Sequence, residues 1–459
     1  MKKRILFIIG IIDNGGVARS IINLLNVIDT DKYDIHLLIM SAKQNEYEKL
    51  IPKSITIHRN FIIGCLLDKW TGIINLFKHQ QPAIALGSIL RILISPFNKG
   101  IAGLLLSKLF PKIEGEYDMI VDYNGQQNLY YMIDKLNAQH KVTFFHSDYK
   151  KWQHYKNIDK KYYPKADYIF TISDTCVSSL KNFFPDATSK IKLFENISRP
   201  EIIYKLSEKK IYDNLNSEII LVTIGHVCFN KGTDIALKSA KILKDIGYKF
   251  KWLFLGTIIE KEYINLAKKL GLEEYTKFMG NVENPYPYIR KATIVVHTSR
   301  FEGKSIAIDE SKILCKPIVA TNFSTVEDQL THGVNASICN INPDDVSNSI
   351  EKLINDTQLR NKYITYLKNN LIDNSKEINK LYQILIPFVI KTAIIHFLGM
   401  QYMGLDTLFI SILQVLNLAE LGVGSAMVFS MYRPIAEGDK KKICQLMNLY
   451  KKYYRIIGI

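Results

Sequence analysis

Short apolar runs and amphipathic stretches alternate along most of the chain. Arg4–Ile12 is a continuous apolar run, as buried parallel strands are, and Val17–Val27 repeats its apolar positions with helical spacing. A second apolar run, Tyr33–Met40, follows. A strand, a helix and a strand in this order predict a βαβ unit and therefore a doubly wound parallel sheet.

The same alternation starts again in the second half of the chain. Between the halves, residues 199–217 are polar and charged and include Pro200, which predicts a linker. We therefore expect two Rossmann-like α/β domains, residues 1–198 and 218–383. A chain of 459 residues, 47% of them apolar, is also longer than one core usually organises. The further predicted strands are 117–123, 141–145, 166–172, 190–196, 218–225, 251–255 and 293–296.

Three of the predicted strand-to-helix turns carry residues that suit an anionic ligand. Gly15 and Gly16 form the first turn, GHVCFNKGTD (225–234) the second and SRFEGK (299–304) the third. Backbone N–H groups at the start of a helix, together with its positive end, attract phosphate. For the glycine pair, a purely structural role is the alternative.

Two carboxylates flank the start of the helix predicted at 305–314. Glu302 lies in the turn and Glu310 about two helical turns later, roughly 10–12 Å along the helix axis. Each could hold one end of an elongated ligand such as a nucleotide-sugar, while a diphosphate lies over the amides between them. The alternative is a pair of solvated surface charges. The amides in question belong to Gly303, Lys304, Ser305 and Ile306.

The stretch VVHTSRFEGKSIAIDESKILC, residues 295–315, resembles the donor-binding element of retaining glycosyltransferases with the GT-B fold, the group 1 family. The resemblance implies two domains facing a cleft, with Glu302 on the donor sugar and Glu310 on the ribose. It covers about residues 2–381, because FMGNVENPYPYIR, KPIVAT and HGV continue the family pattern in order.

The second turn resembles the family pattern Gly-Arg-Leu-x-x-x-Lys-Gly, in which Arg and Lys neutralise the donor diphosphate. Gly225, Lys231 and Gly232 match, but His226 stands where arginine is usual. A guanidinium is permanently charged, whereas imidazole has an ordinary pKa of about 6.5. Lys231 is therefore expected to stabilise the leaving group, and a contribution from His226 stays open.

His146 directly follows the predicted strand 141–145, at the strand end where doubly wound folds place ligands. The family often has a histidine here, bordering the donor sugar and the reaction centre. The resemblance thus implies that His146 donates a hydrogen bond to a sugar hydroxyl or to the developing oxyanion. A structural histidine is the alternative, and Asp148 is a further candidate.

The resemblance implies a retaining, metal-independent glycosyltransferase that needs no cofactor besides its nucleotide-sugar donor. Lys231 and helix amides would take the place of a metal cation at the diphosphate. The leaving phosphate itself would help to deprotonate the acceptor, so no separate enzyme base is required. The expected acceptor is a hydroxyl of a lipid-linked oligosaccharide in capsule or other cell-surface polysaccharide synthesis.

The chain carries a net charge of +16, but its Lys and Arg residues are spread along it without a nucleic-acid module. We expect anionic lipid and nucleotide partners and no nucleic acid. The six cysteines form no C-x-x-C pair, which indicates reduced, cytosolic thiols. Residues 61–112 are apolar and basic, so their helices either lie on a membrane surface or cover the sheet.

The composition changes near residue 384. The apolar runs 384–400 and 408–431 approach the length of a membrane span and are followed by lysine clusters, which predicts a cytosolic loop. The stretch AELGVGSAMVFSMYRPIAEGDKKK resembles the opening of polysaccharide flippases. Residues 384–459 hold only a fragment of one, so they imply an anchor at the cytoplasmic face of the cell membrane or a fusion remnant. A soluble helical cap is the alternative.

Two other functions remain open. In one, a decayed transferase fused to the flippase fragment acts as a membrane-associated binding module. His226 and the reduction of the usual Gly-x-Gly to Gly256 favour it, whereas Glu302, Glu310 and Lys231 oppose it. The other is a nucleotide-sugar epimerase of the same architecture.

Overall fold

The computed structural model describes residues 2–13, 15–211, 217–381, 439 and 441–448. The chain divides into two compact units, Met1–Leu381 and Tyr382–Ile459. Within the second unit, residues 441–448 are helical. The rest of the apolar segment predicted at 384–459 lies outside the described residues. In the described part of the chain, no helix combines the length and apolar character that a membrane crossing needs.

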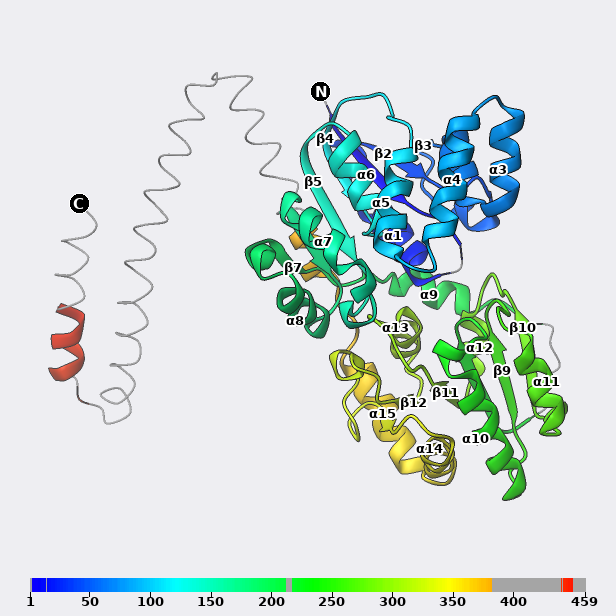
Figure 1. The fold of residues 1–459 in the computed structure, drawn as a ribbon. Coiled ribbons are helices and arrows are strands. Elements are labelled where there is room, and N and C mark those ends of the chain that lie inside the picture. Colours follow the sequence, from blue (N-terminus) through cyan, green and yellow to red (C-terminus); the bar gives the residue numbers. More distant parts are fainter. Residues whose placement is uncertain (1, 14, 212–216, 382–438, 440, 449–459) are drawn as a thin grey trace. The chain divides into compact units, whose positions relative to one another are not determined.

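The first half of the first unit is built on a parallel sheet in the order β3-β2-β1-β4-β5-β6-β7 (Figure 1). The order reverses at β1, as a doubly wound sheet requires. The strands are β1 (Lys3–Ile9), β2 (Tyr33–Ile39), β3 (Thr56–His58), β4 (Tyr117–Asp122), β5 (Ala138–Phe145), β6 (Tyr168–Thr171) and β7 (Ile191–Leu193). The helices are α1 (Gly16–Val27), α2 (Phe61–Leu67), α3 (Lys69–Lys78), α4 (Pro82–Ile94), α5 (Lys99–Leu109), α6 (Gln127–Lys135), α7 (Lys156–Tyr162) and α8 (Asp174–Phe183).

The second half repeats the plan with a parallel sheet in the order β10-β9-β8-β11-β12-β13. Its strands are β8 (Ile220–Ile224), β9 (Lys251–Leu255), β10 (Thr276–Gly280), β11 (Ile294–His297), β12 (Ile318–Thr321) and β13 (Ser337–Cys339). Its helices are α9 (Pro200–Ser207), α10 (Thr233–Asp245), α11 (Glu262–Lys269), α12 (Tyr286–Lys291), α13 (Ile306–Ile313), α14 (Pro343–Asn355) and α15 (Thr357–Asn369).

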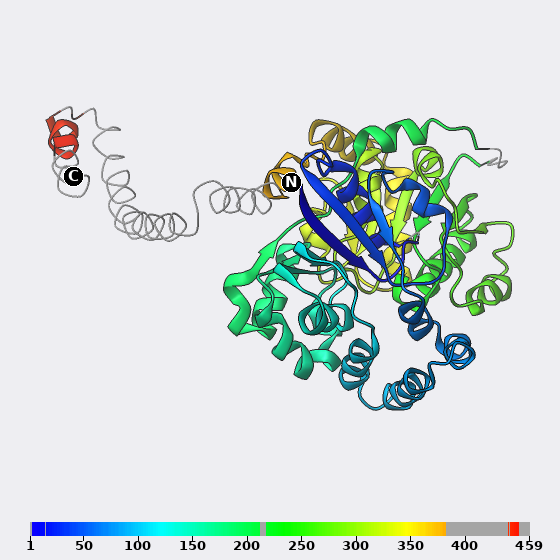
Figure 2. The same ribbon diagram turned by 90° about the horizontal axis from the view of Figure 1, so that it is seen from above.

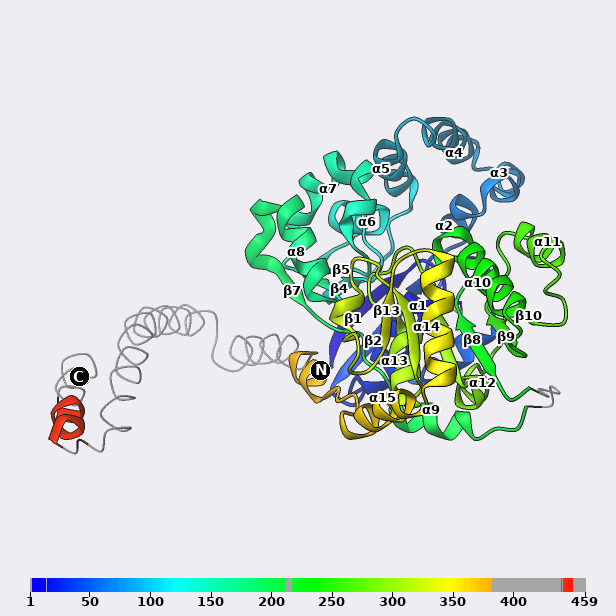
Figure 3. The same ribbon diagram turned by 90° about the horizontal axis from the view of Figure 1, so that it is seen from below.

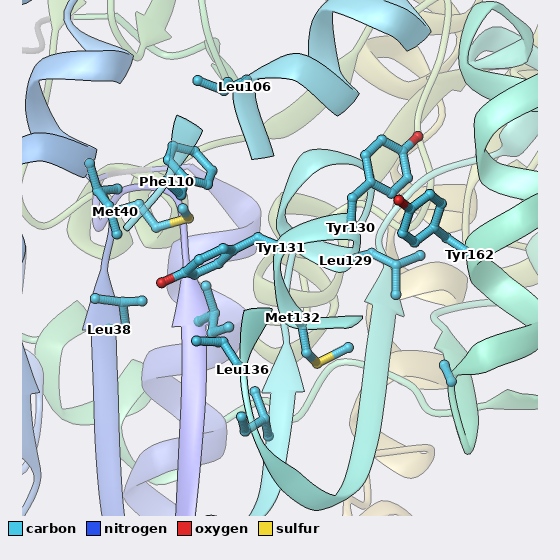
Figure 4. Packing of buried hydrophobic residues seen from close by; sticks show 14 of the residues in the cluster. Leu38, Met40, Leu106, Phe110, Leu129, Tyr130, Tyr131, Met132, Leu136 and Tyr162 are labelled. Carbon is cyan, nitrogen blue, oxygen red and sulfur yellow. The ribbon is translucent and has the colours of Figure 1, made fainter. Parts of the chain in front are cut away.

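Helix α6 shows how the first core combines apolar packing with polar anchoring. Figure 4 shows Tyr131 pointing toward Leu38 while the adjacent Tyr130 points the other way, toward Tyr162. The Tyr130 hydroxyl donates to the buried Asp159 carboxylate at 2.5 Å, so its polar end is satisfied inside the core.

The first part of the predicted linker 199–217 is helical. Its composition is polar overall, but residues 200–207 form α9, whose Ile203 is buried in the core of the second half. Proline at the first helical position and a buried apolar side chain stabilise this helix.

The predicted boundary at residue 383 also differs from the structure. Residues 375–381 are helical and contact the first half rather than extending the second. The Asn374 side chain donates through Nδ2 to the Ser198 carbonyl and accepts through Oδ1 from the Ser198 N–H. Lys380 donates to the Leu193 carbonyl. The chain therefore returns to the first half at the end of the first unit.

Candidate active site

A pocket of about 240 Å³ lies where the carboxyl ends of strands from both sheets meet. Turns after β1, β5, β8 and β11 contribute to it, because parallel strands end at one edge of their sheet. Its lining residues are Gly15, Gly16, Val17, Arg19, His146, Ile172, Asn196, Ile224, Gly225, His226, Lys231, Leu255, Gly256, Thr257, Glu302, Gly303, Lys304, Ser305, Ile306 and Ala307.

Lys231 is held in place by the turn that precedes α10. The next residue, Gly232, has φ +64°, and a Cβ there would lie 1.9 Å from the Thr298 carbonyl oxygen, so only glycine fits. The Thr298 hydroxyl in turn donates to the Lys231 carbonyl at 2.9 Å. These contacts tie the lysine turn to the end of β11, from which Glu302 comes.

Glu302 is held by three donors on a single carboxylate oxygen. Its Oε1 accepts from Lys231 Nζ at 2.5 Å, from Ser299 Oγ at 2.6 Å and from the ring of His297 at 3.0 Å. Burial alone would raise the pKa of Glu302, but Lys231 and His297 outweigh it and hold this pKa far below its usual range. Glu302 is therefore ionised at neutral pH.

The second oxygen of Glu302, Oε2, accepts no hydrogen bond from the residues that the structure describes. A fixed carboxylate with one uncommitted oxygen in a pocket is suited to accept from a ligand hydroxyl.

Two histidines line the pocket as neutral rings. Burial lowers the pKa of His146 to about 3, and its buried Nε2 has no hydrogen-bond partner among the described residues. Burial and then the neighbouring Lys231 lower the pKa of His226. At neutral pH, His226 therefore does not supply the permanent charge of the arginine that the family usually has here.

Glu310 does not line the pocket and is only 3% exposed. Its carboxylate accepts from Arg19 Nη1 at 2.7 and 2.9 Å and from the Tyr286 hydroxyl at 2.9 Å. Arg19 belongs to α1 of the first half and does line the pocket. The carboxylate predicted to bind ribose is thus held in an ion pair between the two halves.

The turn before α13 differs in one detail from the expectation that four successive amides face a ligand. The Ser305 N–H donates to the Gln329 side chain at 2.7 Å, so this amide is already used. The Lys304 side chain is only 9% exposed, and its ammonium group donates to Glu195 of the first half at 2.6 Å. Gly303 allows close approach, because a Cβ there would lie 2.6 Å from the His146 carbonyl oxygen.

The structure brings all predicted site residues except Glu310 and the further candidate Asp148 to one pocket. The sequence reading missed Arg19 and Asn196, which reach the pocket from the first half, and His297, which holds Glu302. The predicted candidate Asp148 is buried, and its carboxylate accepts from Ser179 and Ser324. Within the described residues, no three His, Cys, Asp or Glu side chains gather closely enough to hold a metal ion.

Comparisons with known proteins agree with this geometry. Residues 205–370 match the family of group 1 glycosyl transferases. An uncharacterized glycosyltransferase of Methanocaldococcus jannaschii is 28% identical over 54% of this chain and 65% of its own length. The capsular polysaccharide biosynthesis glycosyltransferase CapM of Staphylococcus aureus is 26% identical over 33% of this chain and 41% of its own length.

A third relative, from Campylobacter jejuni, is named N-acetylgalactosamine-N,N'-diacetylbacillosaminyl-diphospho-undecaprenol 4-alpha-N-acetylgalactosaminyltransferase. It is 25% identical over 48% of this chain and 58% of its own length. The chain thus matches between 41% and 65% of the length of these three relatives.

Solved structures share the fold. HepE of Anabaena in complex with UDP and glucose has a TM-score of 0.60 at 16% identity, over 83% of this chain and 98% of that one. WaaG, a glycosyltransferase involved in lipopolysaccharide biosynthesis, has a TM-score of 0.56 at 12% identity, over 83% and 99% of the two chains. The two Rossmann-like sheets have the GT-B arrangement, and the second half carries a group 1 glycosyltransferase domain.

Proposed function

We propose that this protein transfers a sugar from a nucleotide-sugar to a hydroxyl of a lipid-linked oligosaccharide, at the cytoplasmic face of the cell membrane, in cell-surface polysaccharide synthesis. The observation that carries the proposal is the contact of Lys231 with Glu302 in a pocket between two Rossmann-like halves. One cation and one carboxylate side by side suit a ligand with an anionic diphosphate next to sugar hydroxyls.

Three of the comparisons support the substrate classes. The HepE structure contains UDP and glucose, and the Campylobacter enzyme is named for a diphospho-undecaprenol acceptor. CapM is named for capsular polysaccharide biosynthesis. Together they favour a nucleotide-sugar donor, a lipid-linked acceptor and a role in capsule synthesis.

In the proposed reaction, Lys231 stabilises the charge that develops on the leaving diphosphate. The remaining amides at the start of α13 add their N–H dipoles, since Ser305 is already bonded to Gln329. No metal is required in this scheme, because the ammonium group and the helix dipole provide the positive potential.

Glu302 and His146 position the sugar in the same scheme. Glu302 Oε2 accepts from a sugar hydroxyl, and the neutral His146 ring donates through Nε2, which has no other partner among the described residues. The leaving phosphate oxygen takes the proton of the acceptor hydroxyl as that hydroxyl attacks on the same face. The anomeric configuration is therefore retained.

Two observations favour a second candidate, the decayed transferase that acts as a binding module. His226 is neutral where the family has a permanent charge, and Glu310 is already paired with Arg19. Under this alternative the pocket binds a nucleotide, but the protein does not catalyse sugar transfer. The tail 384–459 would anchor the protein to the membrane in either case. No observation on the site favours the epimerase.

Incubation with a panel of radiolabelled nucleotide-sugars and a bacterial lipid extract separates these functions. Transfer of label to lipid, lost in Glu302→Gln, supports the proposal. Binding without turnover of any donor supports the decayed module, and release of an epimerised nucleotide-sugar would support the third function. Either of the last two results would overturn the proposal.

A further inference from the structure

Helix α4 carries apolar side chains on its inner and its outer side, interrupted by Ser88 and Arg91. Ala85 on its inner side is buried, and Ile84, Ile89 and Ile92 pack against the first core. Its outer side carries Leu86, Leu90 and Leu93, whose side chains are 51–62% exposed. A helix that is apolar on all sides is normally buried in a large core or in a membrane. Among the described residues, nothing covers the outer side of α4.

Helix α3 presents a second exposed apolar row beside it. Trp70, Ile74 and Phe77 are spaced four and three residues apart, so they share one face of α3, and all are exposed. Phe97, one helical turn beyond Leu93, is 91% exposed. Helices α3 and α4 pack against each other and lie at the rim of the first half in all three ribbon views (Figures 1, 2 and 3). We name this surface the apolar stripe: Trp70, Ile74, Phe77, Leu86, Leu90, Leu93 and Phe97.

Basic residues predominate in the segment that carries the apolar stripe, and Asp68, at the start of α3, lies 3.7 Å from the Lys43 ammonium group. Residues 69–112 contain no Asp or Glu, but six basic residues: Lys69, Lys78, Arg91, Lys99, Lys108 and Lys112. None of the six forms an ion pair with another described residue. Arg91 is the only charged residue within α4, and its buried Nε has no hydrogen-bond partner in the described structure. Because no carboxylate among the described residues pairs with Arg91, its positive charge is available to an anionic partner.

The chain segment that leads from β3 to α2, and on to α3 and α4, leaves the sheet at the same edge as the active-site turns. Strand β3 ends at His58 and α2 begins at Phe61, while β1 ends at Ile9 and continues to Gly15. Strands β1, β2 and β3 are parallel neighbours, so both segments leave from their carboxyl ends.

We propose that the apolar stripe of α3 and α4 is a docking surface for an anionic lipid bilayer. Its apolar side chains enter the acyl boundary, while the surrounding Lys and Arg residues contact lipid phosphates. This inference rests on the proposed function, because the proposed lipid-linked acceptor lies in the bilayer that the surface would bind. The tail 384–459 is less suited than an anionic bilayer to cover the apolar stripe. It contains eight Lys or Arg and four Asp or Glu residues and is therefore itself cationic. A second copy of the stripe would bring like charges together.

Trp70 provides an intrinsic probe of this surface in the full-length chain. Of the three tryptophans, Trp70 is 60% exposed, Trp252 is fully buried and Trp152 is partly buried against the core. Phosphatidylglycerol vesicles with brominated acyl chains should quench Trp70 fluorescence, whereas phosphatidylcholine vesicles should quench it much less. Trp70→Phe should abolish the quenching. No donor is present, so the result does not depend on the transfer reaction.

A pair of variants tests the surface itself. Leu90→Glu combined with Leu93→Glu should lower the quenching of Trp70 by brominated phosphatidylglycerol vesicles about tenfold or more, because two apolar side chains lose their burial. Ile246→Glu combined with Ile259→Glu changes two exposed isoleucines of the second half and should leave the quenching unchanged. Vesicle binding without quenching of Trp70 would overturn the proposal, as would equal quenching in both double variants. Self-association through the stripe in place of vesicle binding would also overturn it.

Discussion

Arg19 Nη1 donates to both carboxylate oxygens of Glu310, at 2.7 and 2.9 Å, and so joins the first helix of one half to the donor-site helix of the other. Both side chains are largely buried, at 16% and 3% exposure. Removing one member of a buried pair leaves an uncompensated charge, whereas removing both does not.

Arg19→Met should therefore destabilise the protein by about 3 kcal/mol, because Glu310 loses its guanidinium partner. The double variant Arg19→Met with Glu310→Gln should recover most of that loss. Thermal unfolding of the wild type, both single variants and the double variant measures the coupling between the two sites. Additive effects of the two substitutions would mean that this ion pair does not join the halves.

Glu302→Gln should lower the rate of sugar transfer about 100-fold or more, since a neutral amide accepts weakly from a sugar hydroxyl and no longer balances Lys231. Steady-state kinetics with the active donor measures the effect, and circular dichroism checks the fold. Glu327→Gln alters an exposed carboxylate and should keep the wild-type rate. Equal rates for both variants would remove Glu302 from the proposed mechanism.

Lys231→Gln should reduce kcat by about two orders of magnitude, because the leaving diphosphate loses its ammonium group. Lys231→Arg should retain more activity, since it keeps the charge but changes its geometry. Lys238→Gln, on the exposed side of α10, is the matched control. The role of the lysine charge would be refuted by a Gln variant that performs as well as the Arg variant.

Because of His226, the affinity for the donor should rise as the pH falls. Burial, followed by Lys231, lowers its pKa below the ordinary value of about 6.5, so the ring gains a proton, and a charge that attracts the diphosphate, only in more acidic solution. The KM for the donor should therefore fall as the pH is lowered through the range below the ordinary histidine pKa. His226→Gln should flatten that dependence, and His226→Arg should lower KM several-fold at pH 7.5. A wild-type profile that persists in His226→Gln would assign the titration to another group.

Much of the fold and the site could be predicted because their signals are local. Each strand-to-helix turn is encoded within about ten residues, so the positions of Lys231, Glu302 and His146 at strand ends could be predicted from the sequence alone. The doubly wound topology then brings these ends together. Glu302 could be predicted from its motif, whereas its partner His297, which directly follows the predicted strand 293–296, carries no sequence signal of its contact with Glu302.

The missed features depend on contacts between distant residues. Arg19 is one basic residue on an amphipathic helix, and nothing near it in the sequence indicates Glu310, which is 291 positions away. Helix α9 was hidden by the polar composition around it, although Ile203 is buried. The return of residues 375–381 to the first half follows from tertiary contacts such as that between Asn374 and Ser198.

A crystal structure of the chain with its nucleotide-sugar donor tests the central claim most directly. The account predicts that the diphosphate lies within hydrogen-bond distance of Lys231 Nζ, and that a sugar hydroxyl donates to Glu302 Oε2. A donor bound outside the pocket between the two sheets, or bound there without contacting Lys231 or Glu302, would contradict it.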